Sequence, residues 1–182
     1  MSIPQLESQA TIADLERVNG KAEIVNGKLV LMSPTGDDHN SAALNIGTSL
    51  KLHQRAHGGG RPYTDGASFI LSSTRTVSPD VAWYLGPRTG PDYLKGAPLL
   101  AVEIRSKSNY GPTAEREMAW KRADYFAAGT QVVWDVDLLR EGVIRVYRAS
   151  DPESPTVYRR GEVADAEPAV PGWRFPVDEL WD

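Results

Sequence analysis

The sequence predicts a single domain of the α/β (α+β) class, in which helices flank a mixed β-sheet. Short apolar runs separated by turn residues alternate with longer stretches of helical periodicity, which is typical of this class. The run 99–104 is apolar on both alternations up to Glu103, as expected for a strand covered on both faces. A chain of 182 residues that is 41% hydrophobic is long enough to bury one such core.

The N-terminal part predicts a short helix followed by a β-hairpin. Thr11 and Asp14 have the spacing of a reciprocal helix cap, in which each side chain binds a free backbone amide of the first turn. The strand-like segments 22–25 and 28–32 flank Asn26-Gly27, a pair that tolerates the positive φ angles of a tight hairpin turn.

The middle of the chain predicts two longer helices and three strands. Segment 37–57 begins with two aspartates, ends with basic residues and is followed by three glycines, which suits the helix dipole and a helix end. Segments 67–71, 77–85 and 99–104 are strand-like, and we expect 99–104 at the centre of the sheet. Segment 111–128 predicts a second helix. An apolar stripe on this helix is expected to face the core and consists of Ala119, Trp120, Ala123, Phe126 and Ala127.

The C-terminal part predicts a further pair of strands at 131–136 and 143–147. The core of the domain is therefore expected at about 20–148, within a single domain that spans 1–182. The proline-punctuated tail 149–182 is expected to form edge strands and to wrap or pack on this core.

The composition excludes several classes of function. The absence of cysteine excludes disulfide scaffolds, cysteine nucleophiles and thiolate metal sites. Twenty Lys and Arg against 24 Asp and Glu give a net charge of -4, so the chain lacks the basic footprint of a strong non-specific nucleic-acid binder. No run approaches the ~20 apolar residues that span a bilayer, and the polar start lacks the pattern of a signal peptide. We expect no membrane partner and a cytoplasmic location.

Two carboxylates stand out because they interrupt apolar, strand-like sequence. Burying Asp80 or Glu103 is unfavourable unless the carboxylate meets a cation, a metal or a proton. Since strand side chains alternate, Glu103 and Arg105 project from the same face. One interpretation is a structural ion pair between these two, with Asp80 satisfied near a strand end. The other is that Asp80 and Glu103 share a divalent cation, magnesium or manganese, both of which prefer oxygen ligands.

Several short motifs follow one another in a specific order. They are, along the chain, 22–30, Pro79-Asp80, Glu103, 121–129 and 133–137. In this order and spacing they resemble the Uma-two family of the PD-(D/E)xK superfamily, whose best-known members are restriction endonucleases. The resemblance runs from about Glu23 to Asp137. It implies a restriction-endonuclease-like fold, with a mixed β-sheet between helices.

The resemblance also implies roles for individual acids. Asp80 and Glu103 would be the catalytic metal ligands, and Glu23 a third catalytic acid that approaches the metal. The alternative for Glu23 is an exposed charge on the hairpin.

The catalytic amine departs from the superfamily pattern. The lysine that normally follows the strand acid by two residues is replaced by Arg105, whose guanidinium binds phosphate well but exchanges protons poorly. The resemblance therefore implies Lys121, which matches a lysine of the family's helix pattern, as the catalytic amine; a pair with Glu117 is the alternative. Arg105 and Lys107 are expected to contact DNA phosphates, although a solvated lysine is the commoner case.

Two further types of residue bear on the site. His39 has a counterpart in the family pattern and could reach the site, or it could make only local hydrogen bonds at a helix start. Trp83, Trp120 and Trp134 lie in apolar periodic runs, and we expect them in the core rather than on a base-stacking surface.

Three functions follow. The first is a metal-dependent DNA endonuclease that hydrolyses phosphodiester bonds. The alternative is a catalytically inactive nuclease-fold binding or regulatory module, which Arg105 at the lysine position and the acidic net charge favour. A third, hydrolysis of another phosphate-containing substrate, has less support. By analogy with restriction enzymes, which often place two sites opposite two strands, we expect a homodimer.

Overall fold

The computed structural model describes residues 9–64 and 66–182. Its main sheet has six strands in the order β11-β10-β9-β8-β6-β3. These strands are β3 (Arg61–Thr64), β6 (Val81–Tyr84), β8 (Leu100–Ile104), β9 (Val132–Asp137), β10 (Val143–Arg148) and β11 (Asp151–Arg159). The pair β8–β9 is parallel and the other neighbours are antiparallel. The sheet is therefore mixed, and β8 lies inside it, as predicted.

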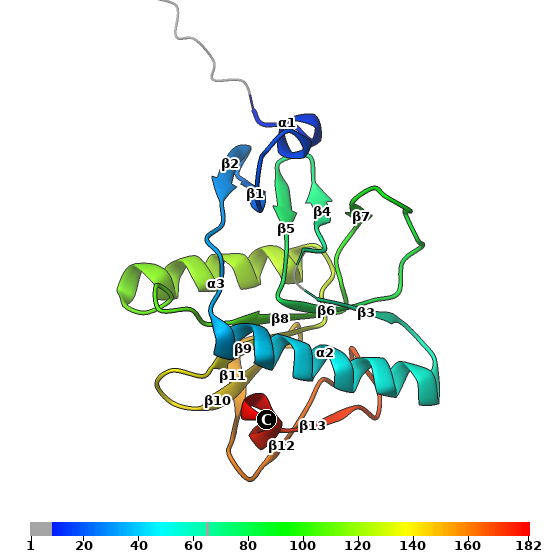
Figure 1. Cartoon of the computed structure of the whole chain (residues 1–182), viewed down its shortest axis with the longest axis vertical. Coiled ribbons are helices and arrows are strands. Elements are labelled where there is room, and N and C mark those ends of the chain that lie inside the picture. The colour runs from blue at the N-terminus through cyan, green and yellow to red at the C-terminus, as the bar shows by residue number, and fades with distance from the viewer. Residues whose placement is uncertain (1–8, 65) are drawn as a thin grey trace, which may run out of the picture.

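Two helices cover opposite faces of this sheet (Figure 1). They are α2 (Asp37–His57) and α3 (Pro112–Ala127). On the α2 face, Val102 and Ile104 pack in one core cluster with Ile46. On the α3 face, Ala101 packs in a second cluster with Tyr125. The alternation of strand side chains thus explains why β8 is apolar in both registers.

A smaller group of strands stands on the α3 side of the sheet, at the top of Figure 1. It contains α1 (Ile12–Glu16), the hairpin β1 (Ala22–Val25) and β2 (Lys28–Leu31), and the strands β4 (Phe69–Ser72), β5 (Arg75–Val77) and β7 (Leu94–Lys95). The backbone amide of Ile24 donates a 2.8 Å hydrogen bond to Thr76 Oγ1, which ties the hairpin to β5. Thr11 and Asp14 form the predicted reciprocal cap of α1.

The tail packs on the chain's own core. It forms the edge strand β11, the pair β12 (Val163–Asp165) and β13 (Arg174–Pro176), and the 3₁₀ helix η1 (Val177–Trp181). The ring of Trp173 stacks on Trp134 of the central sheet with centroids 5.0 Å apart. Asn45 of α2 donates a 3.0 Å hydrogen bond to the carbonyl of Glu179. The tail therefore completes the core on the α2 face.

The structure corrects two predicted elements. Segment 77–85, expected as one strand, is split into β5 and β6 by Ser78-Pro79-Asp80, because proline supplies no amide for a ladder. The apolar stripe of α3 does not form the core contact: Ala119, Trp120, Ala123 and Ala127 are exposed, and Tyr125 is the buried residue of this helix. Phe126 is only partly buried.

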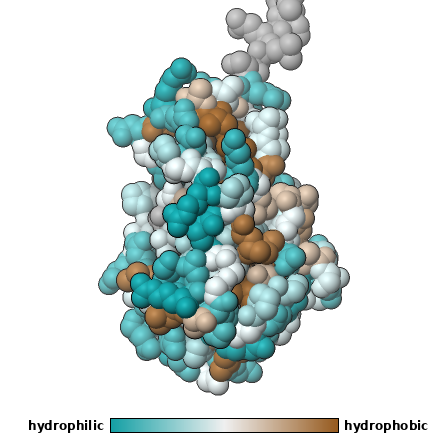
Figure 2. Space-filling model, turned by 90° about the vertical axis from the view of Figure 1, so that its right-hand side faces the viewer, coloured by the Kyte–Doolittle hydropathy of each residue, from teal (hydrophilic) through white to brown (hydrophobic). Residues whose placement is uncertain are grey.

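On the face shown in Figure 2, hydrophobic side chains lie in separate groups among hydrophilic ones. Within the described part of the chain, no helix has the length and apolar character needed to cross a membrane.

Candidate active site

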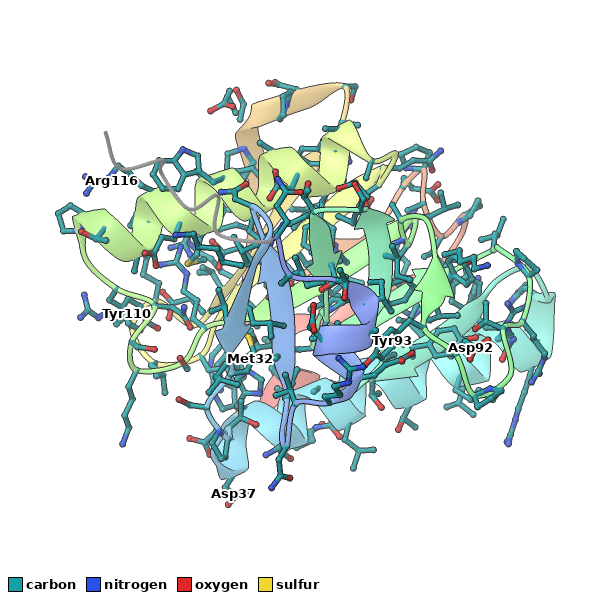
Figure 3. All side chains as sticks on the ribbon, turned by 90° about the horizontal axis from the view of Figure 1, so that it is seen from above. Met32, Asp37, Asp92, Tyr93, Tyr110 and Arg116 are labelled. Atoms are coloured by element: carbon teal, nitrogen blue, oxygen red, sulfur yellow. The ribbon has the colours of Figure 1, made fainter. Side chains whose placement is uncertain are left out.

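Four residues singled out by the sequence line one cleft of about 1050 Å³. Glu23 lies on β1, Asp80 directly precedes β6, Glu103 lies on β8 and Lys121 lies on α3. Figure 3 looks down onto the hairpin above the cleft, with Met32 at the end of β2 and Tyr110 in the loop before α3 on the same side. Residues from four elements, nearly a hundred positions apart at the extremes, therefore converge here.

Asp80 is held against the central strand by backbone hydrogen bonds. Its amide donates to the carbonyl of Val102 at 3.0 Å, and its Oδ2 accepts from the amide of Ile104 at 2.7 Å. His39, in the first turn of α2, places Nε2 3.3 Å from Asp80 Oδ2 and 3.0 Å from the carbonyl oxygen of Ile104. His39 therefore reaches the site. The sequence had left this open against purely local hydrogen bonds at the start of the helix.

Glu103 receives one donor on each carboxylate oxygen. Lys121 Nζ lies 3.0 Å from Oε2, and the hydroxyl of Tyr125 donates to Oε1 at 2.6 Å. Burial raises the pKa of Glu103 to about 7; Lys121 acts against this rise, and the carboxylates of Asp80 and Glu23 reinforce it. The cleft floor thus carries more negative charge than Lys121 alone neutralises.

Glu23 is buried rather than an exposed charge on the hairpin. Its Oε1 accepts from the backbone amide of Ser78 at 2.9 Å and from Lys121 Nζ at 3.2 Å, and its Oε2 lies 3.6 Å from Arg75 Nη1. Burial raises the pKa of Glu23, but Lys121, the Ser78 amide and Arg75 outweigh it and lower the pKa overall. Glu23 is therefore a charged partner of Lys121.

Lys121 pairs with Glu103 and Glu23, and not with Glu117, the alternative partner. Burial lowers its pKa, but the two carboxylates outweigh that effect and raise the pKa above the ordinary value. The amine is therefore an ammonium at neutral pH, able to donate hydrogen bonds and to balance negative charge.

Arg105 pairs with two carboxylates, neither of which is Glu103. It shares the α3 face with Glu103, as alternation predicted, but it pairs with Asp135, through Nε and Nη2 at 2.7 Å each, and with Glu115. The predicted Glu103–Arg105 ion pair is wrong. The side chain of Arg105 lines the cleft but is only 6% exposed, and its contact with phosphate stays a prediction. Lys107 lies in an exposed turn after β8, outside the residues that line the cleft.

Sequence reasoning missed Tyr125 as a site residue. The signal was present, because Tyr125 follows Lys121 by four residues and therefore shares its helix face. Ser78 and Arg75, which hold Glu23, were also missed, since only the tertiary fold brings β5 against the hairpin.

The donor set suits a hard divalent cation. Among the described residues, no group of three or more His, Cys, Asp or Glu is arranged to hold a metal by itself. Asp80 and Glu103 nevertheless offer carboxylate oxygens with free lone pairs, at a point where burial, reinforced by the neighbouring acids, raises the pKa of Glu103. Two carboxylates plus water are a usual environment for Mg²⁺.

Comparisons with known proteins give the family and the fold of the chain. The model of the Uma2 (Uma-two) family, described as "Putative restriction endonuclease", matches residues 8–178. Among solved structures, a "putative nuclease belonging to DUF820" from Anabaena variabilis superposes with a TM-score of 0.74 at 15% identity, covering 94% of this chain and 97% of that one. No curated protein matches the sequence. The family match over nearly the whole chain leads to one conclusion: the protein belongs to the Uma2 family of restriction-endonuclease-like proteins.

Proposed function

We propose that this protein is a DNA endonuclease that depends on magnesium or manganese and hydrolyses phosphodiester bonds in the cleft between β1, β8 and α3. The observation that carries the proposal is the position of Lys121 Nζ, 3.0 Å from Glu103 and 3.2 Å from Glu23. A lysine on a helix thereby supplies the amine that the superfamily usually takes from the strand. The family match to restriction endonucleases supports DNA as the partner.

Asp80 and Glu103 would hold the cation. When bound, Mg²⁺ or Mn²⁺ supplies a Lewis acid that polarises the phosphate and lowers the pKa of a bound water. The side chains of the protein bind the phosphate and stabilise its charge. Lys121, charged at neutral pH, donates hydrogen bonds to the phosphate oxygens where negative charge develops. Its raised pKa makes it unsuited to act as a general base.

The remaining residues orient these groups. Tyr125 fixes the Glu103 carboxylate through Oε1, and His39 contacts the carboxylate of Asp80 from the opposite helix. Glu23, anchored by the Ser78 amide and Arg75, holds Lys121 over the floor of the cleft.

The test is cleavage of supercoiled plasmid DNA by the purified chain with Mg²⁺ or Mn²⁺ and with EDTA. Asp80→Ala, Glu103→Ala and Lys121→Ala are each expected to lower the rate by about 10² or more. Leu52→Ala is the control, because Leu52 is 59% exposed on α2 and outside the cleft. Far-UV circular dichroism checks that each variant folds. Cleavage that persists in both Asp80→Ala and Glu103→Ala would overturn the proposal.

A second candidate is a catalytically inactive nuclease-fold module that binds or regulates. The net charge of -4 favours it, because affinity for DNA depends largely on phosphate neutralisation. Its other support has weakened, since Arg105 belongs to a buried ion pair and Lys121 reaches Glu103 instead. Calorimetry separates the two: an enzyme binds Mn²⁺ at millimolar concentration, and an inactive module need not. The homodimer stays a prediction, to be checked by light scattering.

A further inference from the structure

Trp120 is a large aromatic side chain left exposed at the proposed active site. It is 66% exposed, whereas Trp83, Trp134 and Trp173 are 3% exposed or less. The expectation that Trp120 lies in the core is therefore wrong, while it holds for Trp83 and Trp134. Trp120 directly precedes Lys121 in α3 and lines the same cleft as Lys121 and Glu103.

Apolar side chains from a second part of the chain line the same cleft. The hairpin and the segment after it contribute Leu31, which is 71% exposed, with Met32 and Pro34. Met32 marks this rim in Figure 3. The cleft thus has a charged floor, formed by the carboxylates and Lys121, and a rim of exposed hydrophobic side chains. Its volume of about 1050 Å³ is just above the ~300–1,000 Å³ range of small-ligand sites.

The charges of the cleft favour a ligand held by stacking as well as by phosphate contacts. The basic lining residues are Lys21, Arg75, Arg105, Lys121 and Arg122, and the acidic ones are Glu23, Asp80, Glu103, Glu117, Asp124 and Asp135. With six acidic against five basic side chains in the lining, phosphate neutralisation alone gives weak affinity. The face of a nucleobase is uncharged and stacks on an indole ring whatever the base.

We propose that Trp120 stacks on an unpaired base of the strand whose phosphate lies at Lys121, so that the substrate class is single-stranded or locally unpaired DNA. This inference rests on the proposed function. Inside a duplex both faces of each base are covered by neighbouring bases, so only an unpaired or extruded base offers a face to Trp120. Trp120 and Lys121 line the same cleft, so a strand whose phosphate lies at Lys121 runs through the cleft that Trp120 borders.

The binding test uses the full chain in EDTA, with a thymidine dodecamer and a matched duplex as probes. Because Trp120 is the most exposed tryptophan in the described part of the chain, its fluorescence should be quenched by the single strand. Trp120→Ala should weaken single-strand binding roughly tenfold or more, and Trp120→Phe, which keeps a ring, by less than about threefold. Duplex binding and the Leu52→Ala control should stay unchanged. Equal single-strand affinity of Trp120→Ala and wild type, or binding of neither probe by the wild type, overturns the inference.

A cleavage arm with Mn²⁺ separates this inference from the proposed function. Cleavage of unpaired DNA with KM raised in Trp120→Ala supports both. Cleavage that is equal on duplex and single strand and insensitive to Trp120 overturns the inference and leaves the nuclease intact. Trp120-dependent binding without any cleavage overturns the nuclease and leaves the stacking site.

If acrylamide fails to quench Trp120 in the free protein and Trp120→Ala turns a dimer into a monomer, the side chain belongs to a protein interface and the inference is wrong.

Discussion

The hydroxyl of Tyr125 donates a 2.6 Å hydrogen bond to Glu103 Oε1, while Lys121, one helical turn earlier, binds the other oxygen of the same carboxylate. One face of α3 thereby determines how the strand acid is presented to the cleft. Tyr125 is fully buried, and burial raises the pKa of its phenol, so it remains a donor. The arrangement makes the orientation of Glu103 depend on a fully buried side chain.

Tyr125→Phe tests this positioning role. Phenylalanine keeps the buried ring and removes the hydroxyl, so we expect a loss of about 1 kcal/mol in the free energy of unfolding. We expect kcat for DNA cleavage to fall about tenfold with KM unchanged, because Glu103 loses its fixed orientation. Steady-state kinetics with urea unfolding measures both. An unchanged kcat would show that the hydroxyl serves packing alone.

The affinity for Mn²⁺ should depend more strongly on Asp80 and Glu103 than on Glu23. Asp80→Asn and Glu103→Gln each remove a charged ligand, and we expect each to weaken Mn²⁺ binding at least about tenfold. Glu23→Gln should weaken it less, because Glu23 is held by Lys121, Arg75 and the Ser78 amide. Isothermal titration calorimetry gives the three affinities. A larger loss for Glu23→Gln than for Asp80→Asn would reassign the ligands.

The Arg105 ion pair should matter for stability. Arg105→Ala leaves Asp135, 1% exposed, as an unpaired buried carboxylate, so we expect about 3–5 kcal/mol of destabilisation. Arg105→Lys should also destabilise the fold, because an ammonium cannot replace the two-pronged contact. Lys107→Ala, in the exposed turn nearby, is the control and should change stability by no more than about 0.5 kcal/mol. Equal stability of Arg105→Ala and wild type in urea unfolding would contradict the structure.

Attachment of the tail to the sheet should depend on pH through Asp165. Burial raises the pKa of Asp165, but hydrogen bonds from Tyr158, the Glu167 amide and Arg148 outweigh it and lower the pKa below its usual value. A carboxyl with a lowered pKa in the folded state stabilises the fold above its unfolded-state pKa. That contribution is lost as the pH falls through the folded-state pKa.

Asp165→Asn should therefore destabilise the protein by about 1–3 kcal/mol near neutral pH. The difference from wild type should shrink in acid, below the unfolded-state pKa of the carboxyl. Thermal unfolding of both proteins across this range measures the effect. A difference that stays constant with pH would mean that Asp165 contributes through shape and not through charge.

Most elements of the fold could be predicted from the sequence, but two features were not. The cap at Thr11, the Asn26-Gly27 turn, the helix 37–57 and the central position of strand 99–104 follow from local spacing, and the structure confirms them. The short strand β3 was missed, because its pairing with β6 depends on a distant partner instead of on a local apolar pattern. The break between β5 and β6 was also missed, although Pro79 is itself a local signal for it.

Local sequence determined which residues carry ionisable groups inside apolar strands, and hence that Asp80 and Glu103 required partners. Alternation also settled that Glu103 and Arg105 share a face. Only the tertiary structure decided which partner each obtains: Glu103 meets Lys121 and Tyr125, whereas Arg105 meets Asp135 and Glu115. The physical reason is that a side-chain pattern specifies the face of an element, while the packing of α3 against the sheet specifies which groups face each other across it. The same packing turned Trp120 towards solvent at the cleft.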